Sequence, residues 1–204
     1  MSEVTLKIND TEVTVEEGTT LLVAARGAKA NVPTLCYNKK LTSFGACRLC
    51  LVEIIKGGRS KLVASCVYPV EDGLEVKTES ESVVKFRKGL LELLLAAAPE
   101  VKVIQNYAKR YGVETPRIQV KETNLCILCG LCVRYCAEIK GESAIGFQGR
   151  GTNRKVAFIP EIASQVCVDC KECFSVCPTK QLAGIFEAQI ESPPTNNEFD
   201  DASS

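Results

Sequence analysis

The spacing of the cysteines constrains this chain more than any other feature. The 204 residues include 12 cysteines, which fall into three groups of four with none left over. The second and third groups have the same spacing, C-x2-C-x2-C-x3-C, and the third is followed by Pro178. The groups are Cys36, Cys47, Cys50 and Cys66; Cys126, Cys129, Cys132 and Cys136; and Cys167, Cys170, Cys173 and Cys177.

The chain contains no histidine, and this excludes several kinds of site. Ser-His-Asp and Cys-His catalysis need an imidazole as general base, and many zinc and haem sites need one as a ligand. A Rieske centre needs two. We therefore expect the cysteines to carry the function and expect no catalytic residues.

The compartment decides how so many cysteines are used. The first residues lack the basic stretch and apolar run of a secretory signal, and no apolar run approaches the roughly 20 residues of a membrane span. We therefore predict a cytoplasmic protein with no membrane span. In that compartment cysteines are more typical of metal sites than of disulfides. Structural zinc, which usually takes separated C-x2-C pairs, remains the alternative.

The repeated spacing predicts two clusters that share their ligands. Three cysteines at two-residue intervals bring three thiolates to one cluster, while the fourth ligates the neighbouring one, as in two-cluster ferredoxins. The first cluster would take Cys126, Cys129, Cys132 and Cys177, and the second would take Cys136, Cys167, Cys170 and Cys173. Because each motif lends a ligand to the other, the two must fold together.

The first group of cysteines lies within a different pattern. Residues 4–8 and 12–15 alternate as a hairpin, and residues 20–29 read as a helix. Residues 51–55 and 61–65 form a second strand pair across a Lys-Gly-Gly turn, and residues 74–78 form a last strand. This is the element order of a β-grasp ferredoxin. Four buried structural cysteines are the alternative, since free cysteine packs as a small hydrophobe.

Helices connect the two cysteine-bearing parts. Residues 80–98 show an apolar stripe at helical spacing and stop at Pro99, and residues 101–111 form a second helical stretch. The stripe consists of Val83, Phe86, Leu90, Leu94 and Ala97. Residues 144–147 and 155–159 read as a hairpin. Gly149-x-Gly151 within it does not predict a nucleotide loop, because no third glycine follows.

The fold class predicted from these elements is α+β. We expect a β-grasp domain over residues 1–79, a helical connector over 80–120 and a two-cluster ferredoxin-like domain over 121–186. Residues 187–204 are acidic, with no basic residue, and predict a disordered tail.

With these groups in this order, the chain resembles a family of iron–sulfur electron-transfer subunits. The relatives are the N-terminal part of the large iron–sulfur subunit of NADH dehydrogenase (complex I), the small diaphorase subunit of NAD(P)-linked hydrogenases and the N-terminal modules of [FeFe]-hydrogenases. The resemblance rests on Pro33-Thr34-Leu35-Cys36, on Gly45-Ala46-Cys47-Arg48-Leu49-Cys50 and on the run from Cys126 to Cys136.

The resemblance implies the cofactors. It implies a [2Fe–2S] cluster on Cys36, Cys47, Cys50 and Cys66, and two [4Fe–4S] clusters on the other eight cysteines. Those families place a further cluster, bound by one histidine and three cysteines, between the two parts. Residues 67–125 contain neither residue type, so we expect that cluster to be absent. We expect no flavin or NAD on this chain.

The resemblance also implies the function. The chain would relay electrons within a multi-subunit oxidoreductase, between a flavin- or NAD(P)H-oxidising subunit or a ferredoxin and a separate metal-containing catalytic subunit of hydrogenase, formate dehydrogenase or tungsten-enzyme type. We expect no nucleic-acid partner. A free polyferredoxin that carries electrons by diffusion is the alternative. The formal net charge of zero favours a subunit, because free shuttles are commonly acidic and steer to basic partners.

Overall fold

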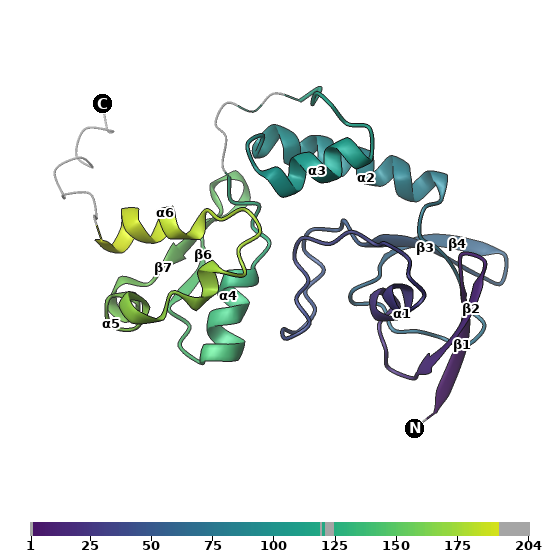
Figure 1. The fold of residues 1–204 in the computed structure, drawn as a ribbon. Helices are drawn as coiled ribbons and strands as arrows, with labels where there is room; N and C mark the ends of the chain where they lie inside the picture. The colour runs from purple at the N-terminus through teal and green to yellow at the C-terminus, as the bar shows by residue number, and fades with distance from the viewer. Residues whose placement is uncertain (1, 119, 121–124, 192–204) are drawn as a thin grey trace. The chain divides into compact units, whose positions relative to one another are not determined.

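The structure is a computed structural model that describes residues 2–118, 120 and 125–191 (Figure 1). The chain divides into two compact units, Met1–Cys129 and Gly130–Ser204. Among the helices of the described residues, none is both long enough and apolar enough to cross a lipid bilayer.

The first unit combines a five-stranded mixed sheet with three helices. Its elements in chain order are β1 (Glu3–Ile8), β2 (Thr11–Glu16), α1 (Leu21–Gly27), β3 (Leu51–Lys56), β4 (Arg59–Ala64), β5 (Glu75–Lys77), α2 (Glu81–Ala97) and α3 (Lys102–Arg110). The strand order is β2-β1-β5-β3-β4, with β1 and β5 parallel and the other neighbours antiparallel. Two hairpins beside a parallel central pair form the β-grasp arrangement that the element order predicts.

The core of this sheet forms because the strands alternate. Leu6 and Ile8 on β1 are each 1% exposed, whereas Lys7 between them faces solvent. Helix α1 adds Leu21 and Leu22, both fully buried, to the same cluster. Each such burial contributes about 1.5–3 kcal/mol, so the packing of α1 fixes where the following loop begins.

Helices α2 and α3 have the predicted positions, but α2 buries a different face. Ser80 caps α2 by accepting a hydrogen bond from the Val83 N–H at 3.4 Å. The predicted apolar stripe is only partly buried, since its member Phe86 is 43% exposed. The buried face instead follows steps of four from Val83 through Arg87 and Leu91. Arg87, which is not part of the predicted stripe, therefore lies on the buried face of α2.

The second unit consists of short helical segments around one hairpin. Its elements are α4 (Leu131–Tyr135), the π-helical turn η1 (Cys136–Lys140), β6 (Ile145–Gln148), the 3-10 turn η2 (Gly151–Asn153), β7 (Lys155–Phe158), α5 (Pro160–Cys170), the 3-10 turn η3 (Glu172–Phe174), α6 (Leu182–Phe186) and the π-helical turn η4 (Glu187–Glu191). Strands β6 and β7 pair antiparallel, in agreement with the predicted hairpin.

An aromatic group forms the centre of the second unit. The ring centroid of Phe186 lies 5.1 Å from that of Phe158 and 5.7 Å from that of Phe174. Phe186 is 1% exposed. These contacts join three separate elements, β7, η3 and α6.

The glycine pair between β6 and β7 has a structural role. Gly149 has φ +76°, and a Cβ there would lie 2.4 Å from the Asn153 carbonyl oxygen. Only glycine, which has no Cβ, allows the backbone at this position to come so close to the Asn153 carbonyl. The geometry of the turn thus accounts for the glycine at this position.

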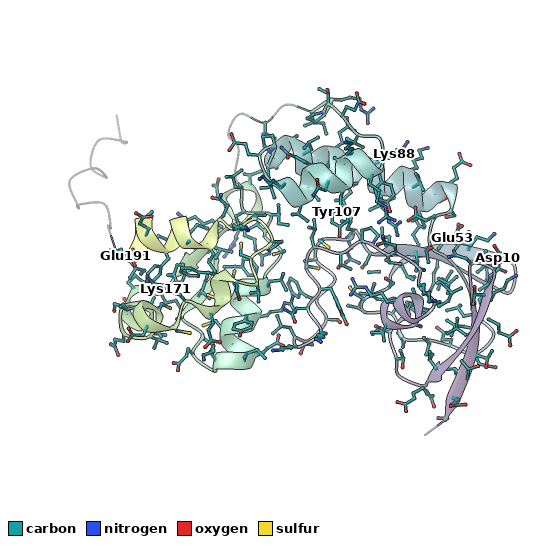
Figure 2. All side chains as sticks on the ribbon, in the orientation of Figure 1. Asp10, Glu53, Lys88, Tyr107, Lys171 and Glu191 are labelled. Carbon is teal, nitrogen blue, oxygen red and sulfur yellow. The ribbon has the colours of Figure 1, made fainter. Side chains whose placement is uncertain are left out.

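The predicted disordered tail begins too early. Residues 187–191 continue α6 as η4. The Gln189 side chain accepts a hydrogen bond from the Phe158 N–H at 2.9 Å, and Glu191 pairs with Lys171 at 2.8 Å (Figure 2). These contacts give the acidic segment specific partners in the fold. The rest of the predicted tail lies outside the described residues.

Candidate metal centres

The first cysteine group lies at one end of the β-grasp sheet. Cys36, Cys47 and Cys50 belong to the loop between α1 and β3, and Cys66 follows β4. Because β3 and β4 form an antiparallel pair, the segment just before β3 and the segment just after β4 lie together. Cys36, Cys50 and Cys66 are each 1% exposed, and Cys47 is half-buried.

Two close contacts connect the four cysteines of this group in pairs. The Cys50 and Cys66 Sγ atoms lie 3.4 Å apart, and the Cys47 backbone N–H donates to Cys36 Sγ at 3.4 Å. A [2Fe–2S] cluster held by four thiolates is bound through two of them at each iron. The division into Cys36 with Cys47 and Cys50 with Cys66 therefore fits that donor set.

The four thiols influence one another's pKa values. The contact with Cys66 lowers the pKa of Cys50 to about 6, because the partner thiol supplies a hydrogen bond to the thiolate. The same contact, then burial, raises the pKa of Cys66, and charges on Cys36 and Cys47 raise it further. The hydrogen bond with Cys36 likewise raises the pKa of Cys47. The close contacts therefore favour the thiolate at Cys50 and disfavour it at Cys47 and Cys66.

A buried serine orients the Cys50 segment. The Ser65 hydroxyl donates to the Cys50 carbonyl oxygen at 2.7 Å, and the Ser65 N–H reaches the same oxygen at 3.3 Å. Ser65 is fully buried, and its own carbonyl accepts from the Leu22 N–H at 3.0 Å. Helix α1 is thus connected to the cysteine loop through one residue.

The cysteines predicted for the second [4Fe–4S] cluster surround one cavity in the second unit. Cys136, Cys167, Cys170 and Cys173 all line it, together with the apolar side chains of Val166 and Phe174 and the charged side chains of Lys140, Glu142 and Lys171. Cys136 begins η1, Cys167 and Cys170 lie on the last turn of α5, and Cys173 lies in η3.

Electrostatic coupling agrees with this shared cavity. Burial raises the pKa of Cys173 to about 12, and charges on Cys136, Cys167 and Cys170 contribute. Burial followed by the charges on Cys136 and Cys170 also raises the pKa of Cys167. The Ala144 N–H donates to Cys136 Sγ at 3.3 Å. N–H groups directed at thiolates are among the features that set iron–sulfur potentials.

The turn between α5 and η3 brings the last cysteine back to this cavity. Lys171, directly after Cys170, has a left-handed backbone with φ 41°. This reversal ends α5 and starts η3, so that Cys173 faces the cavity rather than continuing along the helix. A left-handed residue other than glycine is strained, and here the strain falls beside two of the predicted ligands.

The remaining predicted ligands belong to both units. Cys126 and Cys129 belong to the first unit, and Cys132 and Cys177 belong to the second. Burial raises the pKa of Cys177, but hydrogen bonds from the Thr179 hydroxyl and from nearby backbone groups outweigh it and leave the pKa lowered. A lowered thiol pKa favours the thiolate that a metal requires. This set as a whole stays a prediction from spacing.

The candidate donor sets consist of cysteine sulfurs alone. Sulfur-only donors, burial and N–H groups near the sulfurs fit iron–sulfur clusters.

Sequence patterns did not reveal one buried cation beside the first group. Arg87 on α2 has no exposed surface, and it donates hydrogen bonds to the carbonyl oxygens of Leu49 and Leu51, on either side of Cys50. The available signal was its position, four residues after Val83 and four before Leu91, on the face that α2 buries. A charge among apolar positions at that spacing is uncommon and requires partners.

Comparison with known proteins identifies both parts of the chain. Residues 1–81 match the 2Fe-2S iron-sulfur cluster binding domain family, and residues 125–181 match the 4Fe-4S dicluster domain family. The chain therefore joins a [2Fe–2S] domain to a [4Fe–4S] dicluster domain. The predicted fold class is confirmed.

The relatives that the chain matches are named as subunits of redox enzymes. The chain is 32% identical to the NADP-reducing hydrogenase subunit HndD of Solidesulfovibrio fructosivorans, over 89% of this chain and 36% of that protein. It is 34% identical to the NADH-ubiquinone oxidoreductase 78 kDa subunit of Neurospora crassa, over 76% and 24%. It is 33% identical to the NADPH-Fe(3+) oxidoreductase subunit alpha of Geobacter sulfurreducens, over 88% and 24%.

One solved structure is similar to most of this chain. The crystal structure of an NAD+-reducing [NiFe]-hydrogenase matches with a TM-score of 0.67 and 29% identity, over 76% of this chain and 74% of that chain. The predicted relationship to hydrogenase and complex I iron–sulfur subunits is confirmed. The chain spans only about a quarter to a third of the length of the curated relatives named above.

Proposed function

We propose that this protein is a cytoplasmic electron-transfer subunit of a multi-subunit oxidoreductase, with no active site of its own. It carries one [2Fe–2S] and two [4Fe–4S] clusters and no flavin or NAD. The observation that carries this proposal is the cavity lined by Cys136, Cys167, Cys170 and Cys173. Those four residues come from two separate motifs, and they are the set that crossed ligation requires.

The proposed ligands follow the groups described above. The [2Fe–2S] cluster is held by Cys36, Cys47, Cys50 and Cys66. The first [4Fe–4S] cluster is held by Cys126, Cys129, Cys132 and Cys177, and the second by Cys136, Cys167, Cys170 and Cys173. When bound, the clusters supply reversible one-electron chemistry.

The protein's own residues contribute ligation, hydrogen bonds and exclusion of water. The N–H groups of Cys47 and Ala144 direct partial positive charge at the sulfurs of Cys36 and Cys136. Burial of the thiols would keep water from the inorganic sulfide of a bound cluster. These features, with net charge, set the reduction potential of an iron–sulfur centre.

The proposed partners follow from the relatives. Three names pair a nicotinamide nucleotide with a second redox partner: NADP with hydrogenase, NADPH with Fe(3+) and NADH with ubiquinone. We propose that the chain connects a flavin- or NAD(P)H-oxidising subunit, or a ferredoxin, to a separate metal-containing catalytic subunit of hydrogenase, formate dehydrogenase or tungsten-enzyme type.

The decisive experiment measures iron, acid-labile sulfide and zinc in anaerobically purified protein. The proposal predicts about ten iron and ten sulfide per chain, with both [2Fe–2S] and [4Fe–4S] EPR signals after dithionite reduction. Stoichiometric zinc without sulfide would refute it. The native mass tests the alternative, because a lone 22.1 kDa carrier without associated reductase subunits supports a diffusible polyferredoxin.

Single cysteine substitutions test the ligand sets. Cys66→Ser should remove the [2Fe–2S] signal and leave the [4Fe–4S] signals. Cys177→Ala should damage the cluster built on Cys126, Cys129 and Cys132. If Cys177→Ala instead damaged only the cluster on Cys167, Cys170 and Cys173, the crossed assignment would be wrong.

A further inference from the structure

Helix α2 carries a fully buried guanidinium against the cysteine loop of the first unit. Arg87 is 0% exposed, so bulk water does not solvate its charge. A buried cation persists only when its partners replace that hydration. The hydrogen-bond partners of the guanidinium therefore indicate its role in the structure.

Two of these partners are the backbone carbonyls that flank Cys50. Arg87 Nε donates to the Leu49 carbonyl oxygen at 3.1 Å, and Nη2 donates to the Leu51 carbonyl oxygen at 2.7 Å. The planar fork of a guanidinium presents its N–H donors in fixed directions. Bonding both carbonyls at once therefore fixes the backbone on each side of one thiol.

The guanidinium is in turn held from its other side. Nη1 donates to Glu79 Oε1 at 2.8 Å and to the Tyr111 hydroxyl oxygen at 2.7 Å. The Tyr111 hydroxyl donates to the same carboxylate oxygen at 2.9 Å, and Arg110 lies 3.4 Å from it. Both cations thus share one carboxylate, and the group retains net positive charge.

Apolar packing seals this contact against the cysteine loop. Leu35 and Leu49, which precede Cys36 and Cys50, form a buried cluster with Leu91 of α2 and Tyr111. Cys47, Tyr107 of α3 (Figure 2) and neighbouring apolar residues pack against the same cluster. The helical pair therefore forms a wall of the first cysteine site.

We propose that Arg87 is a positioning residue for the [2Fe–2S] cluster, holding the Cys50 segment through the Leu49 and Leu51 carbonyls and adding positive charge beside the site. The inference rests on the proposed function, because it requires a cluster on the first cysteine group. Partners of metal ligands commonly change affinity about 10- to 100-fold when they are replaced. Positive charge favours the reduced, more negative form, so it raises the potential.

The test compares three substitutions in the full, cluster-loaded chain. Arg87→Met removes the charge and both carbonyl bonds. Arg87→Lys keeps the charge but loses the planar fork. Lys88→Met is the matched control, because Lys88 is exposed on the same helix (Figure 2) and its loss removes the same charge. The readouts are iron retention against a chelator, the [2Fe–2S] EPR signal and the midpoint potential, with the [4Fe–4S] signals as internal reference.

The expected result is selective. Arg87→Met should weaken iron retention at the [2Fe–2S] site about 10-fold or more and shift its potential to more negative values, with the [4Fe–4S] signals unchanged. Arg87→Lys should weaken retention with a smaller shift in potential, and Lys88→Met should match the unsubstituted chain. Equal [2Fe–2S] retention and potential in Arg87→Met and Lys88→Met would overturn the inference.

A milder variant covers the case in which Arg87→Met does not fold. Tyr111→Phe removes one hydrogen bond to the guanidinium and keeps the ring. It should alter the [2Fe–2S] EPR signal alone; an unchanged signal, or equal loss of both cluster types, would refute a positioning role. Failure of the proposed function gives a different result, since the unsubstituted chain would then lack the [2Fe–2S] signal.

Discussion

Glu79→Gln tests whether one carboxylate holds the buried cation beside the cysteine loop. Glu79 accepts from Arg87 at 2.8 Å and from the Tyr111 hydroxyl at 2.9 Å. The arginine side chain is 0% exposed and the glutamate side chain is 44% exposed. Breaking a fully buried pair costs about 3–5 kcal/mol, whereas exposed pairs contribute about 1 kcal/mol or less. Between these limits we expect a loss of about 2 kcal/mol.

Amide hydrogen exchange with mass spectrometry measures this loss locally. If local opening of α2 and β3 breaks this contact, a loss of about 2 kcal/mol should make the amides of their peptides exchange about 30-fold faster. Peptides from α5 serve as an internal reference, and Glu100→Gln, an exposed carboxylate, is the matched control. In a double-mutant cycle with Arg87→Met, the combined cost should fall well below the sum. Exchange within threefold of the Glu100→Gln protein, or full additivity, would refute the reasoning.

Three further changes test other parts of the fold. Arg117 lowers the pKa of Glu92 to about 2 through its hydrogen bonds. The ion pair therefore stabilises the folded state above the unfolded carboxyl pKa of about 4.3, and this stabilisation is lost as the pH falls toward about 2. The Arg117 Nε NMR signal should shift over that range, and a constant signal would contradict the pairing. Gly149→Ala should destabilise the β6–β7 hairpin by more than about 1 kcal/mol, whereas Gly151→Ala, with nothing within 4 Å of the added Cβ, should cost less; thermal unfolding compares them. Phe186→Ala should cost about 3–5 kcal/mol and speed iron release from the second [4Fe–4S] set, while exposed Phe86→Ala should do neither.

The sequence predicts the fold because its strongest signals are local. Alternation over β1 and β2, and the Gly57-Gly58 turn before β4, depend on neighbours along the chain. Cysteine spacing likewise predicts which thiols share one cluster, and Cys136 lines a cavity with three cysteines of the following motif. Periodicity also places α2, whose observed ends, Glu81 and Ala97, lie within one residue of those predicted.

The parts that sequence reasoning missed depend on contacts distant in the chain. The face that α2 buries is set by the Leu49 and Leu51 carbonyls, which lie 38 and 36 residues from Arg87. A pattern based on hydrophobicity selects Phe86 and passes over a charged residue. The early tail boundary has the same cause, because Gln189 is held by Phe158, 31 residues away. Such partners become visible only once the fold is known.

The two cysteine sets that lie within single units are supported by different physics, and this predicts different mutational behaviour. The Cys50 segment is held by directional hydrogen bonds from Arg87 and Ser65. The η3 segment of Cys173 is held by apolar packing, because Phe174 contacts Phe186 at 5.7 Å. Directional bonds depend on the chemistry and geometry of the donor, whereas packing depends on volume. At Arg87, therefore, lysine should be a poor replacement despite its similar charge and length. At Phe186, leucine should preserve much of the stability and iron retention that alanine loses.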